Sequence, residues 1–529
     1  MFTNRVDALK SMRSEYRTKL SACALLIPTL AAFLSPASAH AQESQGVYLD
    51  RLTINETENA VVRISTQNPA EDLFVTNFIT GDEVYRQNVA ASEQVNGPTP
   101  WIDAEWPRSE TIPSLPPGLY MVQVDPSAVV PNTVAFVQET YRVPLFVAPT
   151  TSTADVLLIS PSLTSTCYNQ WGGGKSCYTP PNTDVGYKRP GYIPQYYKKM
   201  KVVIDRLEDL GHSWDVIDEQ YLETNPEFIK NYRAAIIVEQ VEYATYDMRQ
   251  AYDGYVDSGG RLLILGNELW IFMMRKTGDV YQVYKGQLVD PFASDGDPGN
   301  DHLIADHSVE SDPGPDYPMT RSAGTSYWLA RHPDNTHWTA HRTSHWFYDD
   351  TDLSDGEAFR IGLVRPTQLM DGVTTEYVGS LPYVRDHETY EIPLGTMILA
   401  TIPTSDAQPW DCEFENWQRP ECTRPGTAAI TIMEKPGGGV VMVIPDKRWL
   451  SNSDPISEQL LDNVLDAFAD SNQMDVYAGY QPMVAKVPAS RVWGFAAIAG
   501  LLLLLGLFHL RGLRRTDCES PKQPTASKA

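Results

Sequence analysis

The sequence predicts an α/β domain built on a parallel sheet, preceded by an immunoglobulin-like β-sandwich and followed by a transmembrane helix. Three observations lead to this fold class. Patterns typical of buried strands and of helices alternate over residues 153–275, within a predicted domain of residues 153–470. Residues 47–149 contain short strand patterns separated by turns, and residues 492–510 form an apolar run. A chain of 529 residues is long enough for two or three domains, as this division requires.

The composition limits the classes of partner. The chain is 42% hydrophobic and 21% charged, which is typical of a globular protein. Its net charge of −25 at pH 7 argues against general binding to nucleic-acid phosphates or anionic lipid headgroups. We therefore expect no nucleic-acid partner, whereas a small-molecule ligand or substrate is compatible with the composition. The sequence does not indicate a partner subunit.

The first 41 residues are typical of a signal peptide. Basic residues up to Lys19 precede an apolar run at residues 20–34, and small residues follow it. The sequence Ala-His-Ala at residues 39–41 predicts cleavage after Ala41. An uncleaved anchor helix is the alternative, but the run is short and Pro28 interrupts it.

A second apolar run, residues 492–510, predicts a transmembrane helix. As a helix it would span about 26–28 Å, close to the thickness of a bilayer's hydrocarbon core. More arginines follow the run than precede it, which predicts a cytoplasmic tail at residues 511–529 and a spacer outside the cytoplasm at residues 471–490. We therefore expect a single-pass protein of the inner (cell) membrane, with its ectodomain in the periplasm or outside the cell. A buried core helix is the less favoured alternative.

Four cysteines outside the predicted signal and tail form two closely spaced pairs. Cys167 and Cys177 are ten residues apart, and so are Cys412 and Cys422. This spacing favours two local disulfides in an oxidising compartment. Zinc binding is the alternative, but the closely spaced C-x2-C pairs of zinc sites are missing.

The predicted domains differ in their element patterns. Residues 47–149 carry no cluster of catalytic residue types, so we expect them to position the next domain or to contact a partner. Alternating strands and helices over residues 153–275 predict a sheet like those of flavodoxin and of glutamine amidotransferases. Weak periodicity over residues 280–425 predicts long loops and antiparallel strands. The predicted strands are 156–159, 214–217, 235–240 and 261–265, the helices are 195–210, 226–232, 246–257 and 457–468, and a hairpin covers 428–444.

Three polar residues follow three different predicted strands. Tyr168, Glu242 and Asn267 each come shortly after the carboxyl end of a strand. In open α/β sheets ligands bind at these ends, so the three side chains are predicted to converge on one site. Each residue also has a structural alternative. Tyr168 could be a packed loop aromatic, Glu242 could interact with a helix N-terminus, and Asn267 could form a turn.

Several motifs resemble the C-terminal domain of the N,N-dimethylformamidase large (beta) subunit. The resemblance covers about residues 155–468 and is clearest over residues 155–275. The motifs, in order, are Tyr168-Asn169-Gln170-Trp171-Gly172-Gly173, Arg189-Pro190, Glu242-Tyr243, Met248-Arg249, Gly259-Gly260, Gly266-Asn267, Gly438-Gly439-Val440 and Asn463-Val464-Leu465.

The resemblance implies a metal site. In that family two tyrosines and a glutamate hold one iron ion, and the enzyme hydrolyses a small amide. By match, Tyr168 and Glu242 are implied ligands, with Tyr187 as the second tyrosine and Tyr192 close behind it. Phenolate and carboxylate oxygens suit a hard, highly charged metal ion, which could polarise a carbonyl and acidify water. Asn267 is then expected to orient water or substrate.

The chain departs from the family at the residues that would transfer a proton. Gln240-Val241 stands where the family has His-Asp, and glutamine cannot act as a base near neutral pH. Glu376 is a candidate for a further active-site glutamate. Six histidines could substitute for the missing base: His302, His307, His332, His337, His341 and His345.

Two functions follow from these observations. The first is a metal-dependent hydrolase of small carbon–nitrogen amide bonds. The alternative is a non-catalytic ligand-binding or scaffold protein that keeps the fold without the residues for proton transfer.

Overall fold

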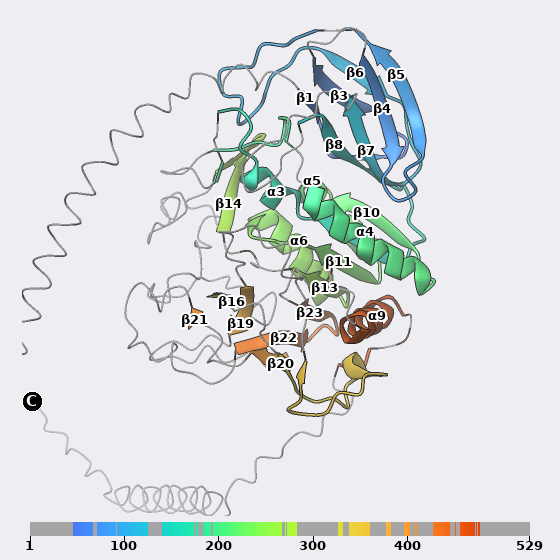
Figure 1. Ribbon diagram of the computed structural model, residues 1–529, viewed down its shortest axis with the longest axis vertical. Coiled ribbons are helices and arrows are strands. Elements are labelled where there is room, and N and C mark those ends of the chain that lie inside the picture. The colour runs from blue at the N-terminus through green and yellow to red at the C-terminus, as the bar shows by residue number, and fades with distance from the viewer. Residues whose placement is uncertain are drawn as a thin grey trace, which may run out of the picture. The chain divides into compact units, whose positions relative to one another are not determined.

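A computed structural model describes most of the chain between residues 46 and 476, all of it within one compact unit. Figure 1 shows the arrangement of its elements. The described residues are 46–66, 71–90, 92–124, 140–173, 176–177, 184–191, 194–266, 270, 272–282, 326–331, 338–359, 377–381, 396–402, 408–409, 427–444, 450, 455–470, 472 and 474–476.

The N-terminal part consists of two small sheets around a common apolar core. One sheet has the order β1-β3-β6 and the other the order β2-β8-β7-β4-β5. Buried valine, leucine and isoleucine side chains from both sheets pack together, among them Val62 and Val122. The strands are β1 (Gly46–Leu49), β2 (Thr53–Asn55), β3 (Ala60–Ser65), β4 (Glu71–Asn77), β5 (Glu83–Val89), β6 (Ser109–Ile112), β7 (Gly118–Val124) and β8 (Arg142–Ala148).

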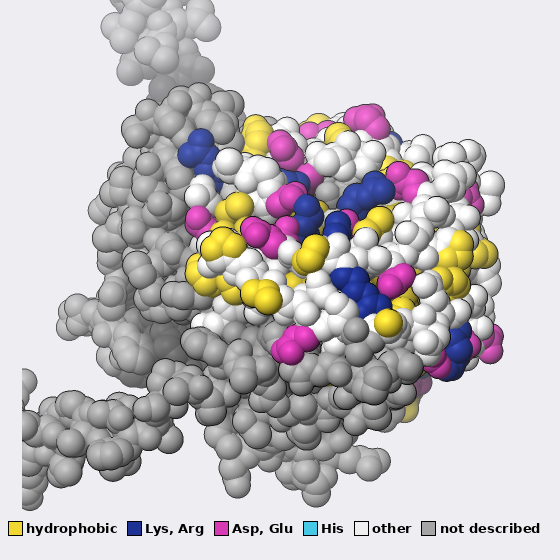
Figure 2. Space-filling view, turned by 90° about the horizontal axis from the view of Figure 1, so that it is seen from above, with side chains coloured by type: hydrophobic (Ala, Val, Ile, Leu, Met, Phe, Trp, Pro, Cys, Tyr) yellow, Lys and Arg dark blue, Asp and Glu magenta, His cyan; other side chains and the backbone are white. Residues whose placement is uncertain are grey.

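Acidic and basic side chains are interspersed on the face of the molecule shown in Figure 2, with small groups of apolar side chains between them. Some of the described charges in the N-terminal part form ion pairs. Arg63 Nε lies 2.8 Å from Asp50 Oδ1, and Arg86 Nη1 lies 2.7 Å from Asp72 Oδ2.

Five parallel strands form the centre of the largest sheet. Their order is β10 (Trp214–Asp218), β9 (Val156–Ser160), β11 (Ala234–Val238), β13 (Arg261–Leu265) and β23 (Val440–Ile444). Residues of β9, β11, β13 and β23 are buried along their whole length, because helices cover both faces. Alternate residues serve opposite faces: Val156 and Leu158 join one apolar cluster, and Leu157 and Ile159 join the other.

The same sheet continues with antiparallel strands, so the predicted fold class is wrong. A hairpin turns β22 (Thr427–Glu434) back against β23, and further strands extend the sheet to twelve among the described residues. The described part is mostly β-sheet with few helices, not a parallel flavodoxin-like or amidotransferase-like domain. The other strands are β16 (Ser326–Arg331), β17 (Trp338–Ala340), β18 (Ala358–Phe359), β19 (Tyr377–Leu381), β20 (Thr396–Ile402) and β21 (Gln408–Pro409).

Helices cover the parallel strands on both faces. Apolar side chains of α4 (Pro194–Asp209) and α9 (Pro455–Ala469) pack on one face, and those of α3 (Ser162–Tyr168), α5 (Glu219–Thr224) and α6 (Tyr246–Asp257) pack on the other. Two single-turn 3₁₀ helices are η3 (Phe228–Asn231) and η4 (Trp346–Tyr348). A small third sheet contains β12 (Tyr243–Thr245), β14 (Phe272–Thr277) and β15 (Val280–Gln282).

Local signals explain where two of these helices begin. The carboxylate of Asp218 accepts a hydrogen bond from the backbone N–H of Gln220 and caps α5, and Thr245 caps α6 by accepting from Met248 N–H. Strand 261–265 and helix 246–257 were predicted from the sequence and are confirmed. Helices α3 and α5 were not predicted, because both are too short to show a clear helical period.

No helix among the described residues is long and apolar enough to cross a membrane. This finding contradicts the predicted single-pass location in the inner membrane. The predicted span at residues 492–510, the signal peptide, the spacer and the tail beyond residue 510 all lie outside the described residues.

Candidate functional site

The last residue of helix α3 reaches across to the loop after β11. Strand β9 ends at Ser160, α3 begins at Ser162, and Tyr168 is the final residue of that helix. The Tyr168 hydroxyl donates a hydrogen bond of 2.7 Å to Glu242 Oε2. The tyrosine and the glutamate that the sequence predicted to converge therefore meet at the carboxyl ends of two neighbouring parallel strands, β9 and β11.

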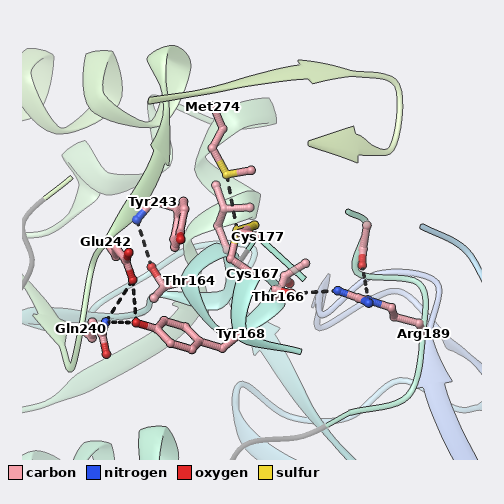
Figure 3. The surroundings of a disulfide bond; sticks show 12 residues. Thr164, Thr166, Cys167, Tyr168, Cys177, Arg189, Gln240, Glu242, Tyr243 and Met274 are labelled. Carbon is pink, nitrogen blue, oxygen red and sulfur yellow. Dashed lines mark hydrogen bonds between the residues drawn. A yellow bond between two sulfur atoms is a disulfide. The ribbon is translucent and has the colours of Figure 1, made fainter. Parts of the chain in front are cut away.

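Gln240 joins the same contact. Its Nε2 donates to the Tyr168 hydroxyl oxygen at 2.6 Å and to Glu242 Oε2 at 3.1 Å. Figure 3 shows the three polar groups pointing toward one another. Gln240 and Glu242 are 4% and 3% exposed, whereas Tyr168 is half-buried, so the triangle is open to water only on the tyrosine side. The triangle formed by Tyr168, Gln240 and Glu242 is the candidate site.

Strained backbone supports the triangle. Glu239 has a φ of +86° and Trp270 a φ of +41°, backbone angles that residues other than glycine rarely adopt. The Glu239 N–H donates to the carbonyl of Leu265 at 2.9 Å, and the Trp270 N–H donates to the carbonyl of Val241 at 2.6 Å. Backbone hydrogen bonds therefore join the loop after β11 to the end of β13 and the loop that follows it.

Gly266 allows this close approach. A Cβ atom at Gly266 would lie 1.8 Å from the Glu239 carbonyl oxygen and 3.3 Å from the Gln240 nitrogen. Every other residue type would therefore push the loop that carries Gln240 and Glu242 away from β13.

A buried ion pair lies next to the triangle in the sequence. The ammonium group of Lys199, on α4, contacts the carboxylate of Glu239. The two side chains are 14% and 2% exposed. A buried carboxylate needs such a partner, so the pair ties the strained loop to α4. Lys199 and Glu239 were not predicted as site residues. The only sequence signal was the position of Glu239 directly after a buried strand.

The predicted disulfide between Cys167 and Cys177 is confirmed. Cys167 directly precedes Tyr168, and the Cys177 N–H also donates to the Cys167 carbonyl at 3.0 Å. Figure 3 shows the bond beside Tyr168 and the sulfur of Met274. The predicted pair Cys412–Cys422 lies outside the described residues.

Of the other predicted site residues, the structure describes only Tyr187, which has a partner of its own. The Tyr187 hydroxyl donates to the Asp50 carbonyl at 3.2 Å, in the N-terminal part. Burial raises the pKa of Tyr187, and the carboxylates of Asp279, Asp218 and Asp50 raise it further, which disfavours a phenolate there. Asn267, Tyr192 and Glu376 lie outside the described residues, so their roles stay predictions.

Burial lowers the pKa of both histidines that we predicted as replacement bases and that the structure describes. Burial lowers the pKa of His345 to about 4, and its ring contacts the Val476 carbonyl and the Phe347 N–H at 3.0 and 3.1 Å. Burial also lowers the pKa of His341. His302, His307, His332 and His337 lie outside the described residues.

The donor atoms of the triangle suit a hard metal ion. A phenol oxygen and a carboxylate oxygen lie 2.7 Å apart, and a metal ion could replace the proton between them. Among the described residues, no three His, Cys, Asp or Glu side chains form a group that could hold a metal ion, so tyrosine would have to contribute. Tyr168 and Glu242 therefore fit two of the three expected ligands.

Two solved structures resemble the chain weakly. One is an exo-β-1,4-mannosidase from Opitutaceae bacterium strain TAV5, with a TM-score of 0.28 and 12% identity over 60% of this chain and 36% of that one. Another is a putative ThuA-like protein from Bacteroides uniformis, with a TM-score of 0.30 and 9% identity over 61% of this chain and 94% of that one. At these TM-scores neither likeness supports an argument about fold or function.

Comparison of the sequence with protein families is more informative. No curated protein matches the chain. In contrast, the family described as N,N-dimethylformamidase beta subunit-like, C-terminal, matches residues 73–449, which include every residue of the triangle. This match covers more than half of the chain, so the chain belongs to the N,N-dimethylformamidase beta subunit-like family.

Proposed function

We propose that this protein is a metal-dependent hydrolase of small carbon–nitrogen amide bonds, with Tyr168 and Glu242 as ligands of an iron ion. The observation that carries the proposal is the contact of 2.7 Å between the hydroxyl of the half-buried Tyr168 and Oε2 of the buried Glu242. Two hard oxygen donors, one from the end of helix α3 and one from the loop after β11, meet there within a family whose named enzyme acts on an amide. When bound, iron would polarise the amide carbonyl and make water more acidic.

The residues of the triangle have distinct roles in this proposal. Glu242 accepts the hydrogen bond that holds Tyr168 in place. Gln240 donates to the Tyr168 oxygen, which favours the phenolate that a metal ion requires. Gln240 cannot take a proton, so it acts as an orienting donor and not as a base. Asn267 keeps its expected role of orienting water or substrate.

The second candidate is a binding protein that has lost catalysis. One observation favours it: Gln240 occupies the position of the family's histidine, and its Nε2 already donates to two oxygens within the triangle. Iron binding and amide hydrolysis therefore need separate measurements.

Iron analysis of the purified protein tests the metal site. Stoichiometric iron in the wild type that is lost in Tyr168→Phe and Glu242→Gln supports the proposal. A matched control is Tyr281→Phe, because the Tyr281 hydroxyl also hydrogen-bonds a buried carboxylate, Glu223, at 3.1 Å. The control should keep its iron. A folded wild type that binds no iron would refute the proposed metal site.

Formamides and other small amides are the substrates to test on the iron-loaded protein. Hydrolysis that disappears in Tyr168→Phe and persists in Tyr281→Phe supports the enzyme. Iron binding without hydrolysis of any small amide would favour the second candidate.

A further inference from the structure

A buried arginine binds the last turn of helix α3. Arg189 is 3% exposed and lies in the segment that follows the disulfide loop. Its guanidinium donates from Nε to the Gly186 carbonyl, from Nη1 to the Trp171 carbonyl and from Nη2 to the Thr166 carbonyl, each at 2.9 Å. Thr166 lies two residues before Tyr168, and Figure 3 shows the bond between Thr166 and Arg189.

The residues beside Arg189 hold the residue that follows Tyr168. Asn169 Nδ2 donates to the Pro190 carbonyl at 2.9 Å, and Asn169 Oδ1 accepts from the Trp171 N–H at 2.9 Å. A Cβ atom at Gly191 would lie 2.4 Å from Asn169 Nδ2, so this position has no room for a side chain. Segment 189–191 therefore contacts the chain on both sides of Tyr168.

The chemistry of Arg189 suits a positioning role. The last carbonyls of a helix have no partner within the helix, and a cationic donor near them is favourable. Burial lowers the pKa of Arg189 to about 9, so the group stays charged at neutral pH. A buried charge is costly, and apolar side chains can fill such a space at less cost. However, an apolar side chain cannot donate hydrogen bonds, so it could not hold the three carbonyls in one fixed geometry as the planar guanidinium does.

We infer that Arg189 is a positioning residue for Tyr168: it fixes the end of α3 so that the tyrosine oxygen meets Glu242 and Gln240. The consequence for iron rests on the proposed function. The positioning itself belongs to the metal-free protein, so it can be measured without iron.

A matched arginine lies elsewhere in the fold. Arg261, at the start of β13, donates from Nη1 to the carbonyls of Ala467, Phe468 and Asp470 at 2.9, 3.2 and 2.8 Å, at the end of α9. Like Arg189, Arg261 binds the end of a helix. It lies at the amino end of β13, however, whereas Gly266 follows the carboxyl end of that strand. Arg261→Met therefore removes the same kind of interaction without touching the Tyr168 loop.

The test follows the Tyr168 ring by 19F NMR, with fluorotyrosine placed at position 168 of the full chain without metal. Arg189→Met should move or broaden the signal, Arg189→Lys should return it part of the way because one cationic donor is restored, and Arg261→Met should leave it at the wild-type position. Arg189→Lys also keeps the test valid if Arg189→Met does not fold. An unchanged signal in the folded Arg189 variants would overturn the inference, as would an equal change in Arg261→Met.

Iron alone provides the second measurement. Fe(III) bound to a phenolate absorbs visible light, so titration of the unlabelled variants with Fe(III) reports on the Tyr168 contact. We expect Arg189→Met to bind Fe(III) about tenfold or more weakly, as when other groups that orient metal ligands are removed. If the wild type gives no such absorption, the proposed metal site fails, while the 19F signal still decides whether Arg189 positions Tyr168.

Discussion

The two ends of the parallel strands are held in similar ways but carry different side chains. At the amino end of β13, Arg261 binds the last carbonyls of α9. At the carboxyl ends of β9 and β11, Arg189 binds the last turn of α3, but here a half-buried tyrosine also meets a buried glutamine and a buried glutamate. A buried arginine on a helix end is therefore not a sign of function by itself. The polar triangle that it supports is what distinguishes the site.

Backbone strain separates the two ends as well. Glu239 and Trp270 both adopt positive φ angles beside the triangle. Strain of this kind costs about 1–3 kcal/mol per residue, and it persists only where the surrounding structure enforces it. The strained backbone at the site thus lowers the stability of the fold and fixes one arrangement of the polar groups.

The largest expected effect comes from adding a methyl group at Gly266. Its Cβ would lie 1.8 Å from the Glu239 carbonyl oxygen, so Gly266→Ala should destabilise the fold by about 3 kcal/mol or more in urea unfolding. Gly439→Ala is the counterpart at the other end, with its Cβ 1.9 Å from the Val256 carbonyl oxygen. Both should lose stability, but only Gly266→Ala should shift the 19F signal of Tyr168. A shift of equal size in both would break the comparison.

Acid should weaken the fold near α9 through His345. Its folded pKa of about 4 lies below the ordinary value of 6.5, so the unfolded chain binds the proton more readily. Stability is therefore complete above pH 6.5 and falls as the pH drops toward 4, by about 3 kcal/mol at the lower value. His345→Asn, which does not titrate, should show a flatter loss in urea unfolding between pH 7 and 4.5. Equally steep curves for both proteins would contradict this assignment.

A smaller effect is expected at the cap of α6, close to the site. Thr245 Oγ1 accepts from the Met248 N–H at 3.3 Å and donates to Glu223 Oε1 at 2.6 Å. Thr245→Ala should therefore destabilise the fold by about 1–2 kcal/mol. Thr245→Ser keeps the hydroxyl and should lose less than half of that in thermal unfolding. If serine were as harmful as alanine, the methyl group and not the cap would explain the loss.

The smallest expected effect has the opposite sign. Gly254 lies within α6, and a Cβ atom there would meet nothing within 4 Å. Gly254→Ala should stabilise the protein by about 0.5–1 kcal/mol, because alanine favours the helix more than glycine does. The 19F signal of Tyr168 should not move. A loss of stability would contradict the open space found at this position.

Local patterns predicted a large part of the parallel region. The helix at 246–257, the strand at 261–265 and the disulfide between Cys167 and Cys177 follow from periodicity and spacing, and the structure confirms them. The convergence of Tyr168 and Glu242 followed from one rule, that ligand groups gather at the carboxyl ends of parallel strands. The match to the family confirms the resemblance that the motifs indicated.

Other features depended on contacts between distant residues. The antiparallel half of the large sheet comes from weakly periodic sequence, so its effect on the fold class could not be inferred from strand patterns. Tyr187 is near Tyr168 in sequence, yet its hydroxyl bonds to Asp50 in another part of the fold. Spacing along the chain does not determine which partner a side chain finds after folding.

By itself, the sequence determined the family, the order of the central elements and the residue types that could hold a metal ion. Only the tertiary structure decided that Gln240 donates to both members of the Tyr168–Glu242 pair and that Arg189 binds the end of α3. The reason is physical. Periodicity and turn signals act over a few residues, whereas a buried hydrogen bond depends on the direction and distance of groups that only the folded chain brings together.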